Sequence, residues 1–229
     1  MAGGEVLAAL GMVAAASGGL VLGRVRTVDM RRQRDEALER LHTDDLTMLP
    51  NRRALYRELG RRTKAGEAYT VAMLDMDRFK AINDRFGHDL GDWVLLQFAM
   101  RLHEVARRLT GYAGRLHGDE FVVVLPAMSD DQAALAAAEI HECTADLLVV
   151  LGHMIFPWAT VGVAAAAVGD SPRDVLHRAD VALYRAKRKE VSVALFDPAV
   201  DMFPPPQEDR PTVRLRELAE LEPDRGVAA

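Results

Sequence analysis

A short acidic turn constrains the fold of this chain most, because it lies directly before a strongly apolar run. The turn spans His117–Phe121, with the one-letter sequence HGDEF, and Val122–Leu125 follow it with the composition of a strand. The glycine permits a tight turn, so residues 112–125 are predicted to form a β-hairpin. Side chains alternate along a strand, so Asp119 and Glu120 are expected to point in different directions. One carboxylate could then hold a metal ion and the other serve a second role, and a solvated turn with two acids is the alternative.

A second acidic stretch ends another apolar run upstream. Val71–Leu74 precede Asp75–Asp77, in which two aspartates flank a methionine. In an extended strand this spacing places both carboxylates on one face. If the strand pairs with the hairpin, Asp75 lies beside Asp119, and oxygen ligands from two strands suit Mg²⁺, which keeps waters and adds substrate phosphates to its shell. A calcium loop is excluded, because Phe79–Lys80 stand where that loop needs an oxygen ligand and a glycine.

Capping residues and hydrophobic spacing predict the other elements. Asn51 is a predicted N-cap for a helix in which Leu55 and Leu59 share a face. Ser171 followed by Pro172 predicts another helix start. The remaining predictions are a strand at Tyr69–Leu74, a polar stretch from Asn83 to Asp92, a helix from Leu95 to about Val105, a helix from Ser129 to about Val149, a strand at Ala159–Ala167, a helix end near Lys187 and a strand at Val191–Phe196.

Five motifs follow one another between about residues 42 and 197. They are Asp44–Arg53 (DDLTMLPNRR), Leu74–Asp84 (LDMDRFKAIND), Gly87–Asp92 (GHDLGD), His117–Phe121 (HGDEF) and Ala179–Lys187 (ADVALYRAK). Together they make the sequence resemble the GGDEF family of diguanylate cyclases. The resemblance implies an α/β fold with a mixed central sheet flanked by helices, similar to class III nucleotidyl cyclases and polymerase palms. The predicted alternation of strands and helices agrees with this fold.

The resemblance also implies a reaction and a metal site. Two GTP molecules would condense into cyclic di-GMP with release of pyrophosphate, in a homodimer whose facing domains each hold one GTP. Each 3′-hydroxyl would attack the opposite α-phosphate, with Mg²⁺ or Mn²⁺ as cofactor. By resemblance, Asp75, the backbone carbonyl of Met76 and Asp119 ligate the metal, and Glu120 is a second metal ligand or the proton acceptor.

The resemblance assigns the remaining site residues to the nucleotide. Asn83 and Asp92 would read the guanine edge, because a carboxylate accepts from N1–H and the exocyclic amine while an amide donates to the purine acceptors. A structural role for Asp92 in the first turn of a helix, where the dipole favours an acid, is the alternative. Backbone amides near Phe79 and Lys80, with the side chain of Lys187, would hold the triphosphate. Read alone, both lysines are ordinary surface residues.

Three departures from the family pattern bear on activity. His117 replaces the first glycine of the signature, and if that position requires a positive φ the change costs roughly 1–3 kcal/mol of strain. Glu190–Ser192 stand where the family has Gly-Arg-Asn, so a phosphate-contacting arginine is replaced by Val191. The product-inhibition motif Arg-x-x-Asp reads Arg108–Gly111, without the aspartate, so no allosteric site is expected.

These observations leave three functional hypotheses. The first is an active diguanylate cyclase without product feedback, supported by the complete set of carboxylates. The second is a degenerate, non-catalytic module that binds GTP or a protein partner, supported by His117 and Val191. The third is a structural dimerisation module, which leaves the retained acids unexplained.

The two ends of the chain predict its localisation and its domain organisation. Val6–Leu22 form an uncharged, mostly apolar run of 17 residues with arginines after it, at the short end of what spans a bilayer. The positive-inside rule then predicts a single-pass anchor in the inner membrane with the catalytic domain in the cytoplasm, and a soluble cytoplasmic protein is the alternative. The predicted organisation is a hydrophobic segment at 1–23, a charged helical linker at 24–43, the catalytic domain at 44–197 and a disordered, proline-rich and charged tail at 198–229.

Composition excludes several other classes of protein. The net charge is −5, and no basic stripe with interleaved aromatics is present, so general nucleic-acid binding is not expected. The single cysteine, Cys143, excludes an intrachain disulfide framework and is typical of a reducing cytosol. Without a cluster of cysteines and histidines, a structural zinc site is not expected either.

Overall fold

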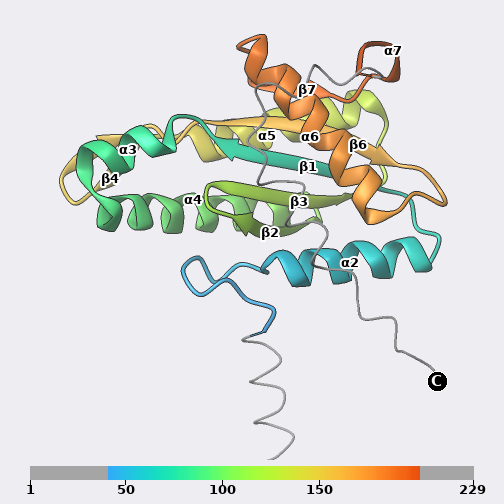
Figure 1. The fold of residues 1–229 in the computed structure, drawn as a ribbon, viewed down its shortest axis with the longest axis horizontal. Helices are drawn as coiled ribbons and strands as arrows, with labels where there is room; N and C mark the ends of the chain where they lie inside the picture. The colour runs from blue at the N-terminus through green and yellow to red at the C-terminus, as the bar shows by residue number, and fades with distance from the viewer. Residues whose placement is uncertain (1–40, 202–229) are drawn as a thin grey trace, which may run out of the picture. The chain divides into compact units, whose positions relative to one another are not determined.

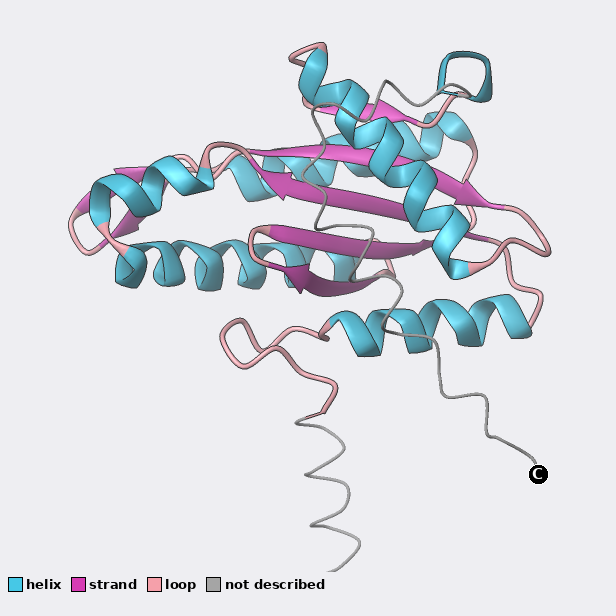
Figure 2. Cartoon of the chain, in the orientation of Figure 1, coloured by secondary structure: helices cyan, strands magenta, loops and turns pink. Residues whose placement is uncertain are grey.

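A five-stranded mixed sheet is the centre of the computed structural model, which describes residues 41–201 (Figures 1 and 2). Its strands stand in the order β2-β3-β1-β6-β7. Their bounds are β1 Tyr69–Met76, β2 Tyr112–His117, β3 Glu120–Pro126, β6 Ala159–Ala166 and β7 Val193–Leu195. All neighbours pair antiparallel except β6 and β7, which are parallel. The prediction of a mixed sheet with flanking helices is confirmed.

Helices cover both faces of this sheet. They are α2 Arg52–Lys64, α3 Phe79–Phe86, α4 His88–Arg108, α5 Asp130–Ala145 and α6 Pro172–Arg188. On β1, Val71 and Met73 pack in one core with residues of α2 and α6, whereas Ala72 and Leu74 pack in a second core with residues of α4 and α5. Figure 1 shows α6 crossing in front of the sheet. Because β1 is buried on both faces, its sequence is a continuous apolar run rather than an alternating one.

The helix starts predicted from capping residues are confirmed. Asn51 caps α2, and its side chain accepts a hydrogen bond from the backbone N–H of Ala54 at 3.1 Å. Ser129 and Ser171 start α5 and α6, each in a capping box with the residue three positions later. Such a pair satisfies backbone donors that a helix start otherwise leaves without partners.

The sequence prediction described Asn83–Asp92 as a polar stretch and assigned no helix there before Asp92. The structure places α3 and the start of α4 there, separated by Gly87 at φ 86°. Phe79, Ile82 and Phe86 lie at helical spacing and pack against the core, so tertiary contacts stabilise a helix whose other side chains are mostly polar.

A short hairpin replaces the predicted last turn of α5, which ends at Ala145 instead of about Val149. Leu148–Val150 form β4 and His153–Ile155 form β5. The two turn residues between them, Leu151 and Gly152, both have positive φ, at 48° and 82°. That conformation is typical of a two-residue hairpin turn, but leucine is an unusual residue in it, so the sequence gives little sign of the turn.

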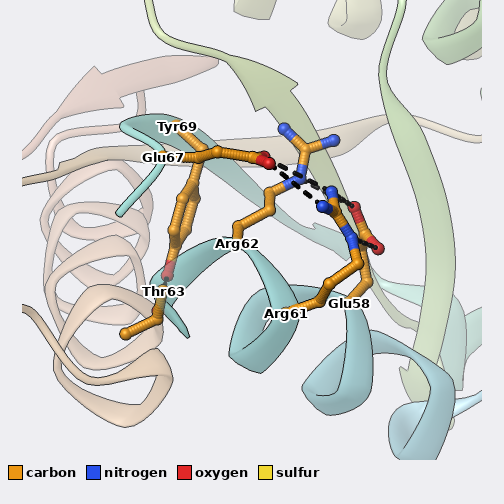
Figure 3. Close-up of polar contacts among 6 residues, drawn as sticks. All are labelled: Glu58, Arg61, Arg62, Thr63, Glu67 and Tyr69. Atoms are coloured by element: carbon orange, nitrogen blue, oxygen red, sulfur yellow. Dashed lines mark hydrogen bonds and ion pairs between the residues drawn. The ribbon is translucent and has the colours of Figure 1, made fainter. Parts of the chain in front are cut away.

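The connection from α2 to β1 is held by a polar network at the end of the helix (Figure 3). Arg61 contacts Glu58 at 2.9 Å and Glu67 at 3.0 Å, and Arg62 contacts Glu58 at 2.8 Å. Hydrogen bonds from Arg61, against the opposing effect of burial, lower the pKa of Glu58 from 4.5 to about 2. Thr63 also lies 3.3 Å from the hydroxyl of Tyr69, which is the first residue of β1.

The predicted terminal segments fall largely beyond these residues. The segments at 1–23 and 24–40 and the tail from 202 to 229 lie outside the described residues. Within residues 41–201, no helix has both the length and the apolar character needed to cross a bilayer. The chain divides into two compact units after Phe196. In the second unit the described part includes a short helix, α7 Pro198–Asp201, at positions that the sequence prediction assigned to the tail.

A close contact between β6 and α6 yields a stability prediction. A Cβ atom built on Gly162 would lie 2.3 Å from the backbone oxygen of Ala179 and 2.3 Å from the backbone nitrogen of Leu183. We therefore expect Gly162→Ala to destabilise the protein by about 1–3 kcal/mol or more, the usual cost of overpacking a core. Urea unfolding followed by circular dichroism measures this loss.

Gly60, inside α2, provides the matched control. A Cβ at Gly60 would meet no atom within 4 Å. Alanine there removes backbone freedom from the unfolded chain, so Gly60→Ala is expected to stabilise by about 0.5–1 kcal/mol. Equal effects of the two substitutions would contradict the close packing of β6 on α6.

Candidate active site

The two acidic stretches meet at one edge of the sheet. Strand β1 pairs with β3 so that Asp75 lies opposite Glu120. The backbone N–H of Met76 donates a hydrogen bond to the carbonyl of Asp119 at 3.2 Å. The structure thus brings together the carboxylates that the strand-pairing argument expected to find side by side.

The turn between β2 and β3 is shaped by Gly118. Gly118 has φ 53°, and His117 and Glu120 pair on either side of the two turn residues. Among the described residues, the left-handed positions other than glycines are Met48, Arg78, Thr110, Leu151 and Glu190. His117 is not one of them. The strain that a left-handed backbone would impose on a histidine therefore does not arise at this position.

The turn is fastened to the segment that precedes α2. The guanidinium of Arg115 donates to the carbonyl of Gly118 at 2.9 and 2.7 Å and to Asp44 at 2.8 Å. Burial alone would raise the pKa of Asp44, but hydrogen bonds from Thr47 and Arg115 more than offset it and lower that pKa. The sequence analysis missed this contact, because Asp44 and Arg115 are 71 residues apart and no periodic pattern relates them.

The two turn carboxylates differ in their surroundings. Burial raises the pKa of the Asp119 carboxyl above its ordinary value of 3.8, and the negative charge of Asp75 raises it further. Glu120 is only 5% exposed. One of its oxygens, Oε2, lies 3.1 Å from Nε2 of His117. The site therefore holds two carboxylates that repel each other and a third that is nearly shielded from water.

Lys187 supplies the positive charge nearest to these acids. Its Nζ pairs with Asp75 and lies 3.6 Å from Asp77. The hydroxyl of Thr160 donates to Asp77 at 2.9 Å. Because one ammonium group contacts both aspartates, Asp75 and Asp77 lie on the same side of the chain, as their spacing predicts.

The end of α6 places Lys187 at this edge. The N–H of Val191 donates to the carbonyl of Ala186 at 3.1 Å, and the N–H of Glu190 donates to that of Lys187 at 3.3 Å. This is the pattern of a Schellman motif, which usually has glycine at the left-handed position. Here that position is Glu190, at φ 53°.

The acids fit a divalent ion that shares its coordination with a substrate. Within residues 41–201 no group of three or more histidine, cysteine or acidic side chains is arranged to hold a metal by itself. Mg²⁺ does not need such a cage, because it binds through one or two carboxylates and completes its shell with waters and phosphates. A cation between Asp75 and Asp119 would also relieve the repulsion that raises the pKa of Asp119.

A buried amide marks a second part of the site. Asn83 lies in α3, and its Oδ1 atom is buried without a hydrogen-bond partner in the described part of the chain. A Cβ on Gly91, in α4, would lie 1.9 Å from that oxygen, so only glycine leaves room beside Asn83. A buried polar atom without a partner costs about 1–3 kcal/mol, so the position of the Asn83 side chain between α3 and α4 is kept at a cost in stability.

The first-turn role considered for Asp92 is wrong. Helix α4 begins at His88, and the acid in its first turn is Asp89. Asp92 lies one turn further along and is exposed. The helix dipole acts mainly within the first turn, so it gives no reason for an acid at position 92.

The start of α3 offers backbone donors. Arg78 precedes the helix in the left-handed region at φ 58°. Phe79 is buried and Lys80 is exposed. The first N–H groups of any helix lack intrahelical partners and attract anions. The structure therefore places backbone donors close in sequence to Asp75 and Asp77, where the resemblance expects the triphosphate.

Comparisons with known proteins agree with this geometry. A family model described as "Diguanylate cyclase, GGDEF domain" matches residues 41–192. The response regulator PleD of Caulobacter vibrioides is 38% identical over 166 residues, and the diguanylate cyclase TpbB of Pseudomonas aeruginosa is 39% identical over 155 residues. These matches cover 69% and 65% of this chain but only 36% and 35% of the relatives.

Solved structures show the same fold. The coiled coil and GGDEF domain of DgcB from Caulobacter crescentus, in complex with c-di-GMP, has a TM-score of 0.68 and 28% identity, and the match covers 78% of this chain and 98% of that chain. The GGDEF domain of TpbB from Pseudomonas aeruginosa has a TM-score of 0.64 and 35% identity, covering 71% and 100%.

The raised pKa of Asp119 predicts how stability depends on pH without a divalent ion. The folded state binds this proton more tightly than the unfolded chain, so stability is lost as the pH rises through the folded-state pKa. Asp119→Asn is therefore expected to raise the melting temperature at pH 7, and the gain should shrink as the pH falls through the folded-state pKa toward 3.8 and be gone below that value. Thermal unfolding between pH 3 and 7 in chelator tests this.

Glu142→Gln serves as the control for this measurement. It neutralises an exposed carboxylate on α5, a helix that carries none of the acidic residues of the site, so its effect on the melting temperature should be small at every pH. A lower melting temperature for Asp119→Asn at pH 7 would contradict the repulsion between Asp75 and Asp119.

Proposed function

The chain belongs to the GGDEF family of diguanylate cyclases, and from this premise we propose that it condenses two GTP molecules into cyclic di-GMP with release of pyrophosphate. The observation that carries the proposal is the meeting of Asp75, Asp119 and Glu120 at one edge of the sheet. The chain spans about a third of the length of PleD and TpbB. The activity is therefore proposed for the matched domain alone, and no property of the remaining parts of PleD and TpbB is carried over to this chain.

Two aspartates and one backbone carbonyl would hold the metal, with Glu120 beside them. Asp75, the carbonyl of Met76 and Asp119 are the proposed ligands, and Glu120 is a second ligand or the acceptor of the proton from the 3′-hydroxyl. A divalent ion bound there polarises the phosphoryl oxygens and lowers the pKa of the attacking hydroxyl. The near burial of Glu120 supports a role at the reacting atoms, because a carboxylate shielded from water interacts strongly with nearby charge.

The nucleotide would be held at its two ends. Asn83 and Asp92 are proposed to bind the guanine edge, the carboxylate of Asp92 by accepting and the amide of Asn83 by donating hydrogen bonds. The amides of Phe79 and Lys80 would bind the triphosphate together with Lys187. Lys187 pairs with Asp75 and Asp77. Its ammonium group would exchange these carboxylates for phosphate oxygens once a metal ion neutralises the acids.

A homodimer is part of the proposal. One domain carries one set of acids and one guanine site, so it presents a single GTP. The reaction joins two GTP molecules, each of which supplies a hydroxyl and an α-phosphate. Two domains must therefore face each other, with each nucleotide attacked by the one on the opposite side.

A non-catalytic module that binds GTP is the second candidate. It is favoured by the segment after α6, where Glu190 occupies a left-handed position and Val191 is 43% exposed. A left-handed residue other than glycine costs of order 1–3 kcal/mol. Valine cannot bind a phosphate, so this module would bind GTP without the contact that the family arginine supplies.

Incubation of the purified protein with GTP and Mg²⁺, followed by chromatography of the nucleotides, separates the two candidates. We expect cyclic di-GMP and pyrophosphate to form. Asp75→Asn and Glu120→Gln should each lower the rate on the order of 100-fold or more, since even an outer-shell partner of a metal ligand costs 10–100-fold. Glu142→Gln is the control and should keep the wild-type rate.

One combination of results would contradict catalysis and support the non-catalytic module. If GTP raises the melting temperature in the presence of Mg²⁺ while no cyclic di-GMP forms in a demonstrated dimer, the non-catalytic module is correct. Stabilisation by a bound ligand follows its affinity for the folded state, so it reports binding without turnover.

We further propose that the product does not inhibit the enzyme. Arg108 contacts Glu139 at 3.3 Å and the sulfur of Cys143 at 3.0 Å. A Cβ on Gly111 would lie 2.8 Å from the side chain of Leu125. An aspartate at the position that completes the inhibitory motif would therefore fit only if the buried side chain of Leu125 moved, and Arg108 already pairs with Glu139.

Initial rates measured with increasing amounts of added cyclic di-GMP test this. The rate should stay constant until the product competes at the active site itself. Gly111→Asp should lower the melting temperature without creating feedback, because the added side chain overpacks the core. Inhibition of the wild type that Arg108→Ala relieves would contradict the proposal.

A further inference from the structure

We propose that His117 is a positioning residue that fixes the carboxylate of Glu120 for metal binding, an inference that rests on the proposed function. His117 stands where the family signature has glycine, and the sequence analysis treated it only as a loss. The structure shows a side chain that contacts the most buried acid of the site.

The geometry of the contact supports this role. Nε2 of His117 lies 3.1 Å from Oε2 of Glu120, within hydrogen-bond distance. A carboxylate accepts hydrogen bonds, so Nε2 carries the hydrogen. The two residues are paired across the hairpin, on either side of Gly118 and Asp119. The backbone pairing therefore places the two side chains next to each other across the hairpin.

Burial distinguishes this contact from an ordinary surface ion pair. The side chain of Glu120 is 7% exposed, whereas that of His117 is 43% exposed. Bulk water can solvate the imidazole but hardly reaches the carboxylate. A shielded acceptor depends on the donors that the protein provides, so the contact matters more to Glu120 than to His117.

Orientation of Glu120 is the expected consequence. A hydrogen bond to Oε2 fixes the rotation of the carboxylate, and a ligand with a fixed orientation binds a metal ion more tightly than one that must be ordered on binding. A glycine at position 117 has no side chain and cannot supply this donor. Compared with glycine at position 117, histidine would therefore favour metal binding and not obstruct it.

The test measures metal dependence and not turnover. The full chain is titrated with Mg²⁺ in the presence of a fluorescent, non-hydrolysable GTP analogue, and the concentration for half-maximal binding is recorded. His117→Phe keeps a ring without the donor, and we expect it to raise that concentration about 10-fold or more. His117→Gln can donate from its amide and should stay close to the wild type.

His103→Phe is the matched control, because His103 is exposed on α4 and distant in sequence from the acidic residues. It should leave the Mg²⁺ dependence unchanged. Melting temperatures show whether each variant is folded. If His117→Phe does not fold, His117→Gly takes its place, since it removes the donor without adding volume.

Each outcome decides the inference. A higher half-maximal Mg²⁺ concentration for His117→Phe, with a value near the wild type for His117→Gln, supports the inference. If these results are obtained but no cyclic di-GMP forms, only the proposed catalysis fails. Equal Mg²⁺ dependence in wild type and His117→Phe overturns it while leaving catalysis standing. A glutamine variant as weak as the phenylalanine variant also overturns it. Failure of the wild type to bind the analogue with Mg²⁺ overturns both proposals.

Discussion

The pairing of β1 with β3 is the constraint on which the site depends. Its register sets Asp75 opposite Glu120 and brings the carbonyl of Asp119 to the N–H of Met76. A slip of one residue would turn every side chain of β1 to the other face, and both faces are packed in separate cores. The apolar core therefore fixes the positions of the acids, although no acid contributes to the core. Binding chemistry at this edge is a consequence of strand register.

The same register places like charges together, and contacts elsewhere in the fold offset part of their repulsion. Burial and the charge of Asp75 raise the pKa of Asp119, so the ionised pair disfavours the folded state. Lys187, at the end of α6, offsets part of this by pairing with Asp75 and Asp77. Asn83 keeps a buried oxygen without a partner in the described residues. Both features are unfavourable for folding, and a divalent cation between Asp75 and Asp119 would relieve the first, as is expected of a binding site.

The sequence predicted the parts of the fold that local patterns encode. The apolar runs gave β1 and β3, and Asn51, Ser129 and Ser171 gave three helix starts. The pattern failed where distant contacts decide. Helix α3 has mostly polar residues and is stabilised by packing, and the turn at Leu151 and Gly152 places a leucine in a conformation that the residue rarely adopts. The ion pair of Asp44 with Arg115 requires the folded chain, because no spacing rule relates residues so far apart, whereas His117 and Glu120 flank the turn of the predicted hairpin and their contact could have been expected from it.

Departures from a family signature have to be weighed by backbone geometry. At position 117 the family glycine is lost, yet the residue that needs a positive φ is Gly118, which is retained, so histidine is accommodated without left-handed strain. At position 190 the reverse holds, since Glu190 ends α6 at φ 53° where glycine would be favoured. Histidine at position 117 therefore imposes less backbone strain than glutamate at position 190. The strained position lies next to Val191, beyond the helix end that presents Lys187, so any loss of nucleotide affinity in this chain is expected from that segment and not from the altered turn.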